Sequence, residues 1–343
     1  MPELAGRVAD AFATRIREQE EAFLSPLAVR SYETRGRLQA EDECRLRTPF
    51  QRDRDRIVHS KAFRRLKHKT QVFIDPSGDH YRTRLTHTLE TTGISRGVAR
   101  ALRLNEDLTE AIGLGHDLGH PAFGHAGEEA LDAALRERFG LGFRHNEHSL
   151  RVVDVLERDG RGLNLTHEVR DGILNHTGPV APESLEGRIV KLVDRVAYIN
   201  HDIDDALRAG VLLAGELPEA PVAMLGATGS TRIDAIVHDL VETSDVAGDI
   251  RQSEPVAEAM LALRAFLFER VYGQGPLRAE AERAAFVVRS LFAHFCEHPA
   301  DMDDGEPALE LATRVTDHVA GMTDRFALRR FEELLLPLAQ AGP

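Results

Sequence analysis

Residues 115 to 128 read Gly115-His116-Asp117-Leu118-Gly119-His120-Pro121-Ala122-Phe123-Gly124-His125-Ala126-Gly127-Glu128. The segment places three imidazoles and two carboxylates within fourteen residues, a density of metal-ligand and proton-transfer groups that packing alone does not explain. An apolar run at helical spacing precedes it and ends at Leu114. We therefore expect His116 and Asp117 to emerge where a helix gives way to a glycine-rich loop, a place that a metal ion can reach.

The rest of the chain is also patterned for helices. Apolar residues recur with the helical period in almost every segment, so we predict an all-α fold. Two of these patterns are Leu85, Leu89, Val98, Ala101 and Leu102, and Ile189, Leu192, Val193, Val196, Ala197 and Ile199. Further amphipathic helices are predicted over residues 126–139, 233–241, 256–271, 278–298 and 307–322.

The best candidate for β structure is short. Thr70-Gln71-Val72-Phe73-Ile74 favours a strand, and Asp75-Pro76-Ser77-Gly78 directly after it has the chemistry of a turn. We therefore expect at most a short β-hairpin within the helical protein.

The chain of 343 residues exceeds the usual size of a single domain, yet no segment divides it cleanly. The most linker-like segment is 225–231, which reads Leu-Gly-Ala-Thr-Gly-Ser-Thr. We expect an N-terminal helical extension over residues 1–50, a catalytic core over 51–224, and a C-terminal helical region over 225–343 that packs on the core.

The balance of charge limits the classes of partner. With 43 basic and 56 acidic residues the net charge is −13, which argues against a general duplex-DNA binder. Residues 52–69 nevertheless carry eight basic and only two acidic side chains, and we call this segment the basic island. Its residues could serve an effector nucleotide or single-stranded nucleic acid, or simply form a solvated face.

Cysteine usage and hydropathy point to a cytoplasmic protein. Cys44 and Cys296 are the only cysteines, too few for a disulfide framework, which favours a reducing compartment. No segment approaches the roughly 20 apolar residues that a membrane-spanning helix needs. We expect no membrane partner.

Two further segments complete a set of potential metal ligands. His87 and Asp194 each lie in a predicted apolar helix, and a carboxylate flanked by Val193 and Val196 is costly to bury unless it is paired or bound to a metal. Together with His116 and Asp117 these residues offer two nitrogens and two oxygens. That mixture suits one divalent ion among Mn, Fe, Ni, Co, Zn and Mg, and we favour octahedral Mn or Fe.

The ordered series His87, His116-Asp117 and Asp194 resembles the H…HD…D signature of the HD phosphohydrolase superfamily. More of the chain, about residues 50–210, resembles the bacterial dGTPase-like dNTP triphosphohydrolases. The segments that carry this likeness are 64–73, 82–90, 115–128, His145-Asn146 and 194–205, with a weaker likeness at 263–270. The resemblance implies an HD-domain helical core that hydrolyses a dNTP to a deoxynucleoside and inorganic triphosphate.

Candidate catalytic residues lie in the same loop. His125 and Glu128 are three residues apart at the predicted start of the next helix, where the carboxylate could fix the tautomer of the imidazole. We interpret them as the acid/base pair, and the resemblance implies the same. His120 and His145 are further candidates for proton transfer, with phosphate binding or a purely structural role as the alternative.

Candidate substrate-binding residues surround the predicted metal ligands. Arg84 precedes His87 by three residues and could reach a phosphate beside the ion, and Arg195 follows Asp194 and could do the same. Asp194, Tyr198 and Asp202 are spaced by four and so line one helical stripe. The resemblance implies that this stripe contacts the deoxyribose, that Tyr198 crowds the 2′ position, and that Gln71 and Val72 lie near the sugar and base.

Other functions remain open on the sequence. Another HD phosphohydrolase, such as a nucleoside 5′-monophosphatase or a (p)ppGpp or cyclic-nucleotide hydrolase, would share the metal ligands. A regulator that senses nucleotides or weakly binds single-stranded nucleic acid through the basic island is a further alternative. The resemblance also implies a homo-oligomer, from dimer to hexamer, and a dNTP effector beside the dNTP substrate.

Overall fold

The computed structural model describes residues 2–71, 82–272, 275–302 and 310–337, and within these the chain folds into helices and no strand. The predicted all-α class is confirmed. Of the candidate hairpin, the described part consists of Thr70 and Gln71, and Thr70 forms an isolated antiparallel bridge with Thr83. Residues 72–81, which include Val72, lie outside the described residues.

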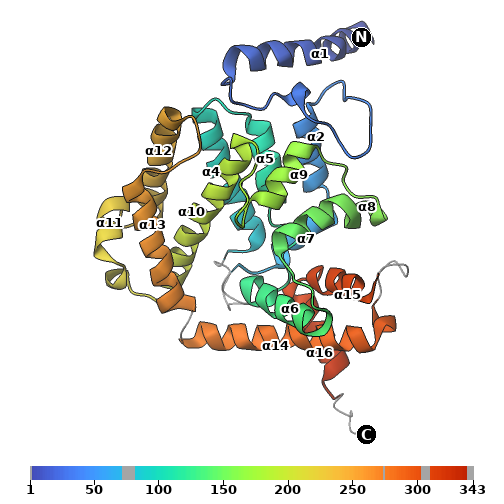
Figure 1. Cartoon of the computed structure of the whole chain (residues 1–343), viewed down its shortest axis with the longest axis vertical. Coiled ribbons are helices and arrows are strands. Elements are labelled where there is room, and N and C mark those ends of the chain that lie inside the picture. Colours follow the sequence, from blue (N-terminus) through green and yellow to red (C-terminus); the bar gives the residue numbers. More distant parts are fainter. Residues whose placement is uncertain (1, 72–81, 273–274, 303–309, 338–343) are drawn as a thin grey trace.

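Helix α10 (Leu185–Arg208) is the central element (Figure 1). It begins at Ser184, whose side chain accepts a hydrogen bond from the backbone N–H of Gly187 and so caps the first turn. Because apolar residues occupy several sides of α10, it packs against neighbours all around. These neighbours are α4 (Arg84–Ala101), α5 (Glu106–Gly115), α9 (His167–Asn175), α12 (Gly229–Ala247) and α13 (Glu254–Leu267).

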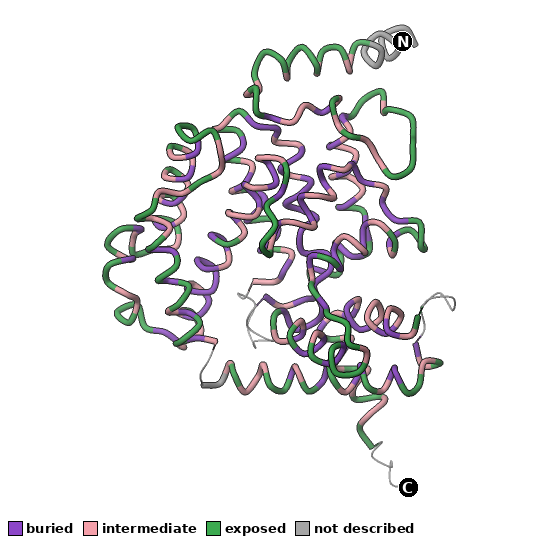
Figure 2. Tube along the Cα trace, in the orientation of Figure 1, coloured by how far each residue is buried: buried purple, intermediate pink, exposed green. Residues whose placement is uncertain are grey.

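The N-terminal part of the chain reaches α5 through helix α2. Helix α2 begins with a capping box between Thr48 and Gln51 and has proline in its first turn, both typical of a helix start. Helix α1 lies along one end of the molecule, and its described side chains are mostly exposed or half-buried (Figure 2). The elements here are α1 (Pro2–Phe23), η1 (Ser31–Glu33), α2 (Pro49–Val58), α3 (Lys61–Arg65) and η2 (Leu66–His68).

A loop of residues 116–123 joins α5 to α6. Phe123, at its end, has a φ of 63° and so adopts the left-handed conformation that non-glycine residues rarely take. At the next position a Cβ on Gly124 would lie 2.4 Å from the carbonyl oxygen of Gln71, so glycine permits the two segments to meet. The elements that follow are α6 (Gly124–Phe139), α7 (His145–Arg151), η3 (Val152–Leu156) and α8 (Glu157–Gly160).

The C-terminal helices pack on the core in two groups. Helices α11, α12 and α13 surround the C-terminal half of α10, while α14, α15 and α16 enclose an apolar core with α6 (Figures 1 and 2). The remaining elements are η4 (Ala214–Glu216), α11 (Glu219–Leu225), η5 (Phe268–Tyr272), α14 (Gly275–Glu297), η6 (Pro299–Asp301), α15 (Leu311–Ala320) and α16 (Asp324–Leu335).

The linker-like segment 225–231 is a short connection between α11 and α12. Thr228 caps α12 through a hydrogen bond from Thr231 N, and Leu240 of α12 is buried with residues of α4 and α10. The segment therefore does not separate α12 from the helices of the core. The three-part division of the chain at residues 50 and 224 stays a prediction.

Candidate functional site

Three helices bring the predicted metal ligands together. His87 lies in the second turn of α4, His116 caps the C-terminus of α5, and Asp194 lies in α10. One ligand atom from each lies within 4.8 Å of those of the other two. Oδ1 of Asp194 is 3.0 Å from Nε2 of His87 and 3.6 Å from Nε2 of His116.

Asp117 joins this group from the adjacent position. Its Oδ1 lies 3.5 Å from Nε2 of His116, and its Oδ2 accepts a hydrogen bond of 2.8 Å from Nη1 of Arg84. Although burial raises the pKa of Asp117, the cationic neighbours His116 and Arg84 outweigh it and hold the pKa well below its ordinary value. Asp117 therefore lies beside the group of His87, His116 and Asp194 and contacts it through His116.

The ring of His116 shows that this group calls for a cation. Its Nδ1 donates a 2.7 Å hydrogen bond to the carbonyl of Gly113, so in the neutral ring Nε2 carries the lone pair. That buried Nε2 has no hydrogen-bond partner among residues 2–71, 82–272, 275–302 and 310–337, and it faces the carboxylates of Asp117 and Asp194. Burial alone lowers the pKa of His116, but the two carboxylates outweigh it and raise the pKa to about 9. A divalent ion at the same place would be stabilised by the same field, so the residues fit a bound metal.

His87 is oriented from behind by a second histidine and a carboxylate. Nδ1 of His87 lies 3.3 Å from Nδ1 of His201, and Nε2 of His201 lies 3.1 Å from Oε2 of Glu90. A carboxylate can only accept, so Nε2 of His201 donates to Glu90, and Nδ1 of neutral His201 accepts from His87. This leaves the lone pair of His87 on Nε2, where it faces Asp194 and the metal site.

A second cluster adjoins the first across Asp117. His120 stacks on His145 with ring centroids 3.8 Å apart, and Nε2 of His120 lies 3.4 Å from Oδ1 of Asp117. Burial, reinforced by neighbouring cations such as Arg84, lowers the pKa of His120 well below its ordinary value. One ligand atom each from Asp117, His120 and His145 lies within 4.8 Å of the other two.

Glu128 binds His145 more closely than His125. Its Oε1 accepts hydrogen bonds of 2.8 Å from both the backbone N and the ring Nδ1 of His145. Its Oε2 lies 3.8 Å from Nδ1 of His125, an ion-pair distance that is too long for a hydrogen bond. The structure therefore adds His145 as the hydrogen-bonded partner of Glu128, and the tautomer of His125 is not fixed by a hydrogen bond to this carboxylate. The side chain of His125 is 62% exposed, and its acid/base role stays a prediction.

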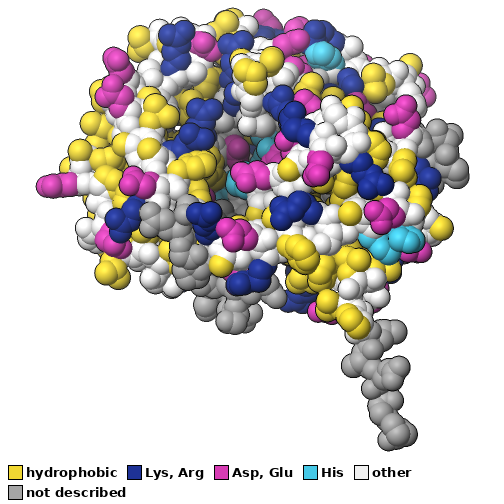
Figure 3. All heavy atoms as spheres, turned by 60° about the horizontal axis from the view of Figure 1, so that its bottom comes forward, with side chains coloured by type: hydrophobic (Ala, Val, Ile, Leu, Met, Phe, Trp, Pro, Cys, Tyr) yellow, Lys and Arg dark blue, Asp and Glu magenta, His cyan; other side chains and the backbone are white. Residues whose placement is uncertain are grey.

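Residues of both clusters, His87 and Asp194 of the first and Asp117, His120 and His145 of the second, line a cavity of about 770 Å³, a volume suited to a nucleotide-sized ligand. It opens on the face shown in Figure 3, where acidic and histidine side chains lie inside a hollow with Lys and Arg around it. Its lining residues include Gln71, Arg84, His87, Asp117, His120, His125, His145, His176, Lys191, Asp194, Arg195, Tyr198, Arg264, Phe268 and Tyr272.

The predicted substrate-binding residues lie in different parts of this site. Arg84 is almost fully buried, and its Nε and Nη2 have no hydrogen-bond partner among the described residues, which favours an anionic ligand beside Asp117. Arg195 is exposed at the cavity wall, and Gln71 is buried, with no partner for its Oε1 in the part of the chain that the structure describes. Val72 lies outside the described residues.

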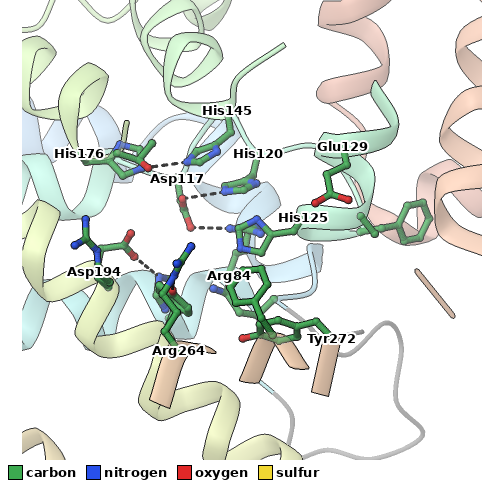
Figure 4. A pocket seen from close by; sticks show the side chains of 18 of the residues that line it. Arg84, Asp117, His120, His125, Glu129, His145, His176, Asp194, Arg264 and Tyr272 are labelled. Carbon is green, nitrogen blue, oxygen red and sulfur yellow. Dashed lines mark hydrogen bonds and ion pairs between the residues drawn. The ribbon is translucent and has the colours of Figure 1, made fainter. Parts of the chain in front are cut away.

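Tyr198 and Asp202 are held by residues of α13 and η5. The hydroxyl of Tyr198 accepts a 2.8 Å hydrogen bond from Arg264, and Asp202 accepts one from the hydroxyl of Tyr272. Asp202 does not line the cavity itself, and burial raises its pKa to about 6. Figure 4 shows Arg264 and Tyr272 on the side of the cavity opposite His145 and His176.

The sequence did not single out several of these residues. Arg264 and Tyr272 come from elements far along the chain, although the segment 263–270 did resemble the family. Lys191 donates its ammonium hydrogens to three backbone carbonyls, among them that of Asn175 at the end of α9. His176 has its Nε2 3.1 Å from Nε2 of His145, and nothing in its local sequence pattern distinguishes it.

Most of the basic island is engaged within the protein. Arg52 and Arg56 both pair with Glu41, and Arg54 pairs with Asp55 and Glu110. A further lysine, Lys61, pairs with Asp159, while Lys69 is buried. Binding of an effector nucleotide or of single-stranded nucleic acid stays a prediction, and the unpaired cations in this segment are fewer than the sequence indicated.

Comparison with known proteins places the chain in a family. Residues 84–199 match the HD domain model, and residues 250–333 match the model of the phosphohydrolase-associated domain. The fold and the histidine–aspartate clusters thus define an HD-domain phosphohydrolase, a class whose domain binds divalent metals.

The curated relatives make the family more specific. A deoxyguanosinetriphosphate triphosphohydrolase-like protein of Caldanaerobacter subterraneus is 54% identical over 93% of this chain and 94% of its own length. One of the same name from Desulfatibacillum aliphaticivorans is 44% identical over 94% of this chain and 97% of its own. The chain belongs to this deoxyguanosinetriphosphate triphosphohydrolase-like family.

A solved structure, a hypothetical protein from Aquifex aeolicus, aligns with 82% of this chain and 71% of its own at a TM-score of 0.46 and 22% identity. That likeness is too weak to bear on the fold or the site. Within the described residues, no helix is both long and apolar enough to cross a membrane.

Proposed function

We propose that the protein hydrolyses deoxynucleoside triphosphates to deoxynucleosides and inorganic triphosphate. The observation that carries the proposal is one cavity lined by His87, Asp117 and Asp194, with Tyr198 and the arginines Arg84 and Arg195 around them. His116 lies directly behind, within ligand distance of His87 and Asp194, and two nitrogens of Arg84 have no partner among the described residues. The names of the relatives, which refer to deoxyguanosine triphosphate, support the same substrate class.

Each part of the substrate has a counterpart in the cavity. The buried guanidinium of Arg84, which has two nitrogens without partners, can bind a phosphate oxygen, and Arg195 can bind another near the opening. Tyr198, fixed by Arg264, can pack against the sugar where a ribonucleotide would carry its 2′-hydroxyl. A divalent ion bound by the four ligands would act as a Lewis acid at the α-phosphate.

The groups proposed to transfer protons lie in the loop between α5 and α6 and at the start of α6. Water attacks the α-phosphorus and gives up a proton, which His125 can accept; the water oxygen stays on the triphosphate, and the bond from phosphorus to the sugar 5′ oxygen breaks. The leaving 5′ oxygen takes a proton, which His125 can deliver because it is exposed at the cavity. Glu128, whose pKa is lowered by its histidine contacts despite burial, stays ionised and supports positive charge on these rings.

The test is to incubate Mn-loaded protein with each dNTP, with GTP and with dGMP, and to separate the products by ion-exchange chromatography. We expect deoxynucleoside and triphosphate from the dNTPs, with one ¹⁸O from labelled water in the triphosphate and none in the deoxynucleoside. Orthophosphate from dGMP would indicate a monophosphatase instead. Binding of nucleotides without any turnover would indicate a regulator.

A further inference from the structure

Asp324, the first residue of helix α16, contacts two loops of the catalytic region. Its Oδ1 accepts a 3.0 Å hydrogen bond from the backbone N–H of Phe123. Its Oδ2 accepts two hydrogen bonds from Thr70, one of 3.0 Å from the backbone N–H and one of 2.7 Å from the hydroxyl. The carboxylate is buried, so these three donors have no competing water.

A second contact joins the same segments. Nζ of Lys69 donates one hydrogen bond to the carbonyl of His120 and one of 3.0 Å to the carbonyl of Ala320, the last residue of α15. Ala122 and Phe123 also lie in the apolar core formed with Val315 and Ala320. The C-terminal helices thus reach residues 69–70 and 120–123 through both polar and apolar contacts.

These two loops carry predicted functional groups. Thr70 directly precedes Gln71, which lines the cavity, and Phe123 lies between His120 and His125. Phe123 adopts the left-handed conformation, which a phenylalanine takes only when its surroundings hold it there. The hydrogen bond from Phe123 N to Asp324 is one such constraint, and it is made at the residue where the loop turns into α6.

We propose that Asp324 is a positioning residue through which the C-terminal helices set the place of His120, His125 and Gln71 relative to the bound metal. This inference rests on the proposed function. Asp324 does not line the cavity, and its hydrogen bonds go to Thr70 and Phe123 rather than to a predicted metal ligand. The ligands His116 and Asp117 lie at the other end of the loop, directly after α5. Its loss should therefore lower turnover and leave metal binding intact.

The isosteric change Asp324→Asn tests whether Asp324 affects turnover without affecting metal binding. An asparagine offers one acceptor oxygen, and its NH₂ group would face either the N–H of Phe123 or the donors of Thr70. At least one loop is then released. Because a misplacement of about 1 Å can cost on the order of 10²-fold in rate, we expect kcat for dNTP hydrolysis to fall by roughly 10- to 100-fold.

The matched control is Asp317→Asn on helix α15. Asp317 also links a C-terminal helix to the core, through two 2.7 Å hydrogen bonds from Arg151 of α7, but it contacts neither loop. Both variants are compared with wild type for kcat and KM, for Mn bound per chain, for melting temperature, and for amide hydrogen exchange of residues 116–124.

In Asp324→Asn we expect faster amide hydrogen exchange at residues 116–124 and a lower kcat, with the Mn content unchanged. In Asp317→Asn we expect the amide hydrogen exchange of these residues and kcat to match those of wild type. Wild-type exchange or wild-type kcat in Asp324→Asn would overturn the proposal, as would an equal loss of kcat in the control at an equal melting temperature. If Asp324→Asn is insoluble, Thr70→Val, which removes one of the three donors, takes its place with the same outcomes.

Failure of the proposed function would look different. Wild-type protein would then release no triphosphate from any dNTP, whatever the variants do. Hydrogen exchange at residues 116–124 would still decide whether Asp324 holds the loop, because it does not depend on the substrate.

Discussion

His116 is the residue at which the electrostatics of the site are clearest. Its lone pair faces two carboxylates at 3.5 and 3.6 Å, an arrangement that is stable only with a positive charge between them. A proton or a metal ion can supply that charge, and binding of the metal must therefore release the proton. The other predicted metal ligands contribute to the charge of the same site, whereas His125 does not belong to the predicted ligand set.

We therefore predict opposite effects of two alanine substitutions. Asp194→Ala removes the oxygen shared by His87 and His116, so both bound metal and turnover should be lost. His125→Ala should keep the metal and lower turnover on the order of 10²-fold or more. Metal analysis by atomic emission beside the triphosphate assay measures both. Retained metal in Asp194→Ala would show that Asp194 is not a metal ligand. A near-normal rate in His125→Ala would show that His125 does not transfer the proton.

Behind the metal ligands, His201 has its own predicted effect. His201→Ala takes away the acceptor for Nδ1 of His87, so the ring no longer has one preferred tautomer or orientation. We expect the affinity for Mn to fall by about 10- to 100-fold, the usual effect of removing such a partner. Titration with a competing chelator measures it. The control is His294→Ala. It removes a histidine of α14 that pairs with Asp301, and the variant should bind Mn like wild type.

At the scale of elements, helices α5 and α9 approach each other closely enough to require glycine. A Cβ on Gly172 would lie 2.5 Å from Cδ1 of Ile112, and one on Gly115 would lie 2.6 Å from Cδ1 of Ile173. This close contact fixes the end of α9, where His176 follows, against the end of α5, where His116 follows. Two of the site's histidines are thus placed by helix packing.

The glycine contact leads to a stability prediction. Gly172→Ala should lower the free energy of unfolding by about 1–3 kcal/mol, because a Cβ there overpacks the interface with Ile112. Gly97→Ala in α4, where a Cβ meets nothing within 4 Å, should instead raise it by up to about 1 kcal/mol through helix propensity. Urea denaturation of both variants tests the pair, and an unchanged or raised stability of Gly172→Ala would contradict the close contact.

Glu186 joins three elements at the start of α10. Its Oε1 accepts hydrogen bonds from the backbone N–H groups of Val29 and Asn105, while its buried Oε2 has no hydrogen-bond partner. Burial raises its pKa from 4.5 to about 7, although these hydrogen bonds lower it. Between those two values the folded state binds more protons than the unfolded chain, so the contribution of Glu186 to stability falls as the pH rises through this window.

Glu186→Gln removes this titration. Relative to wild type, the free energy of unfolding of the variant should rise by up to roughly 3 kcal/mol between pH 4.5 and pH 8, with most of the change below pH 7. Urea denaturation at several pH values provides the difference. A flat difference over the same range would mean that the carboxylate of Glu186 ionises normally and would contradict the prediction.

At the scale of the whole molecule, the predicted metal ties together helices that are far apart in sequence. Its four predicted ligands come from α4, from the two residues that follow α5, and from α10, so an ion binds the folded chain much more tightly than the unfolded chain. The assembly into a homo-oligomer stays a prediction, and the proposed function does not depend on it.

Removal of the metal should therefore lower the melting temperature. At a free Mn concentration 100 times the dissociation constant, binding contributes about 2.7 kcal/mol, which corresponds to a shift of several degrees. Differential scanning fluorimetry with and without EDTA, followed by added Mn, measures it. Asp194→Ala should show no such shift, and an equal response of wild type and variant would mean that the ion binds elsewhere.

The sequence by itself determined the helical class and the family, and it predicted His87, His116, Asp117 and Asp194 as metal ligands. It could do so because helical periodicity and motif spacing are local properties, written within a few turns of chain. The basic island shows the limit of that reasoning, since Arg52, Arg54 and Arg56 pair with acids such as Glu41 and Glu110 that lie outside the segment.

Only the tertiary structure decided which partners these residues meet. Glu128 bonds to His145 rather than to its sequence neighbour His125, and Arg264 reaches Tyr198 across 66 positions of sequence. Asp324 holds Thr70 from 254 positions away. Contacts at such separations depend on how whole helices pack, and packing follows from the shape and volume of many buried side chains together, which no local pattern in one chain records.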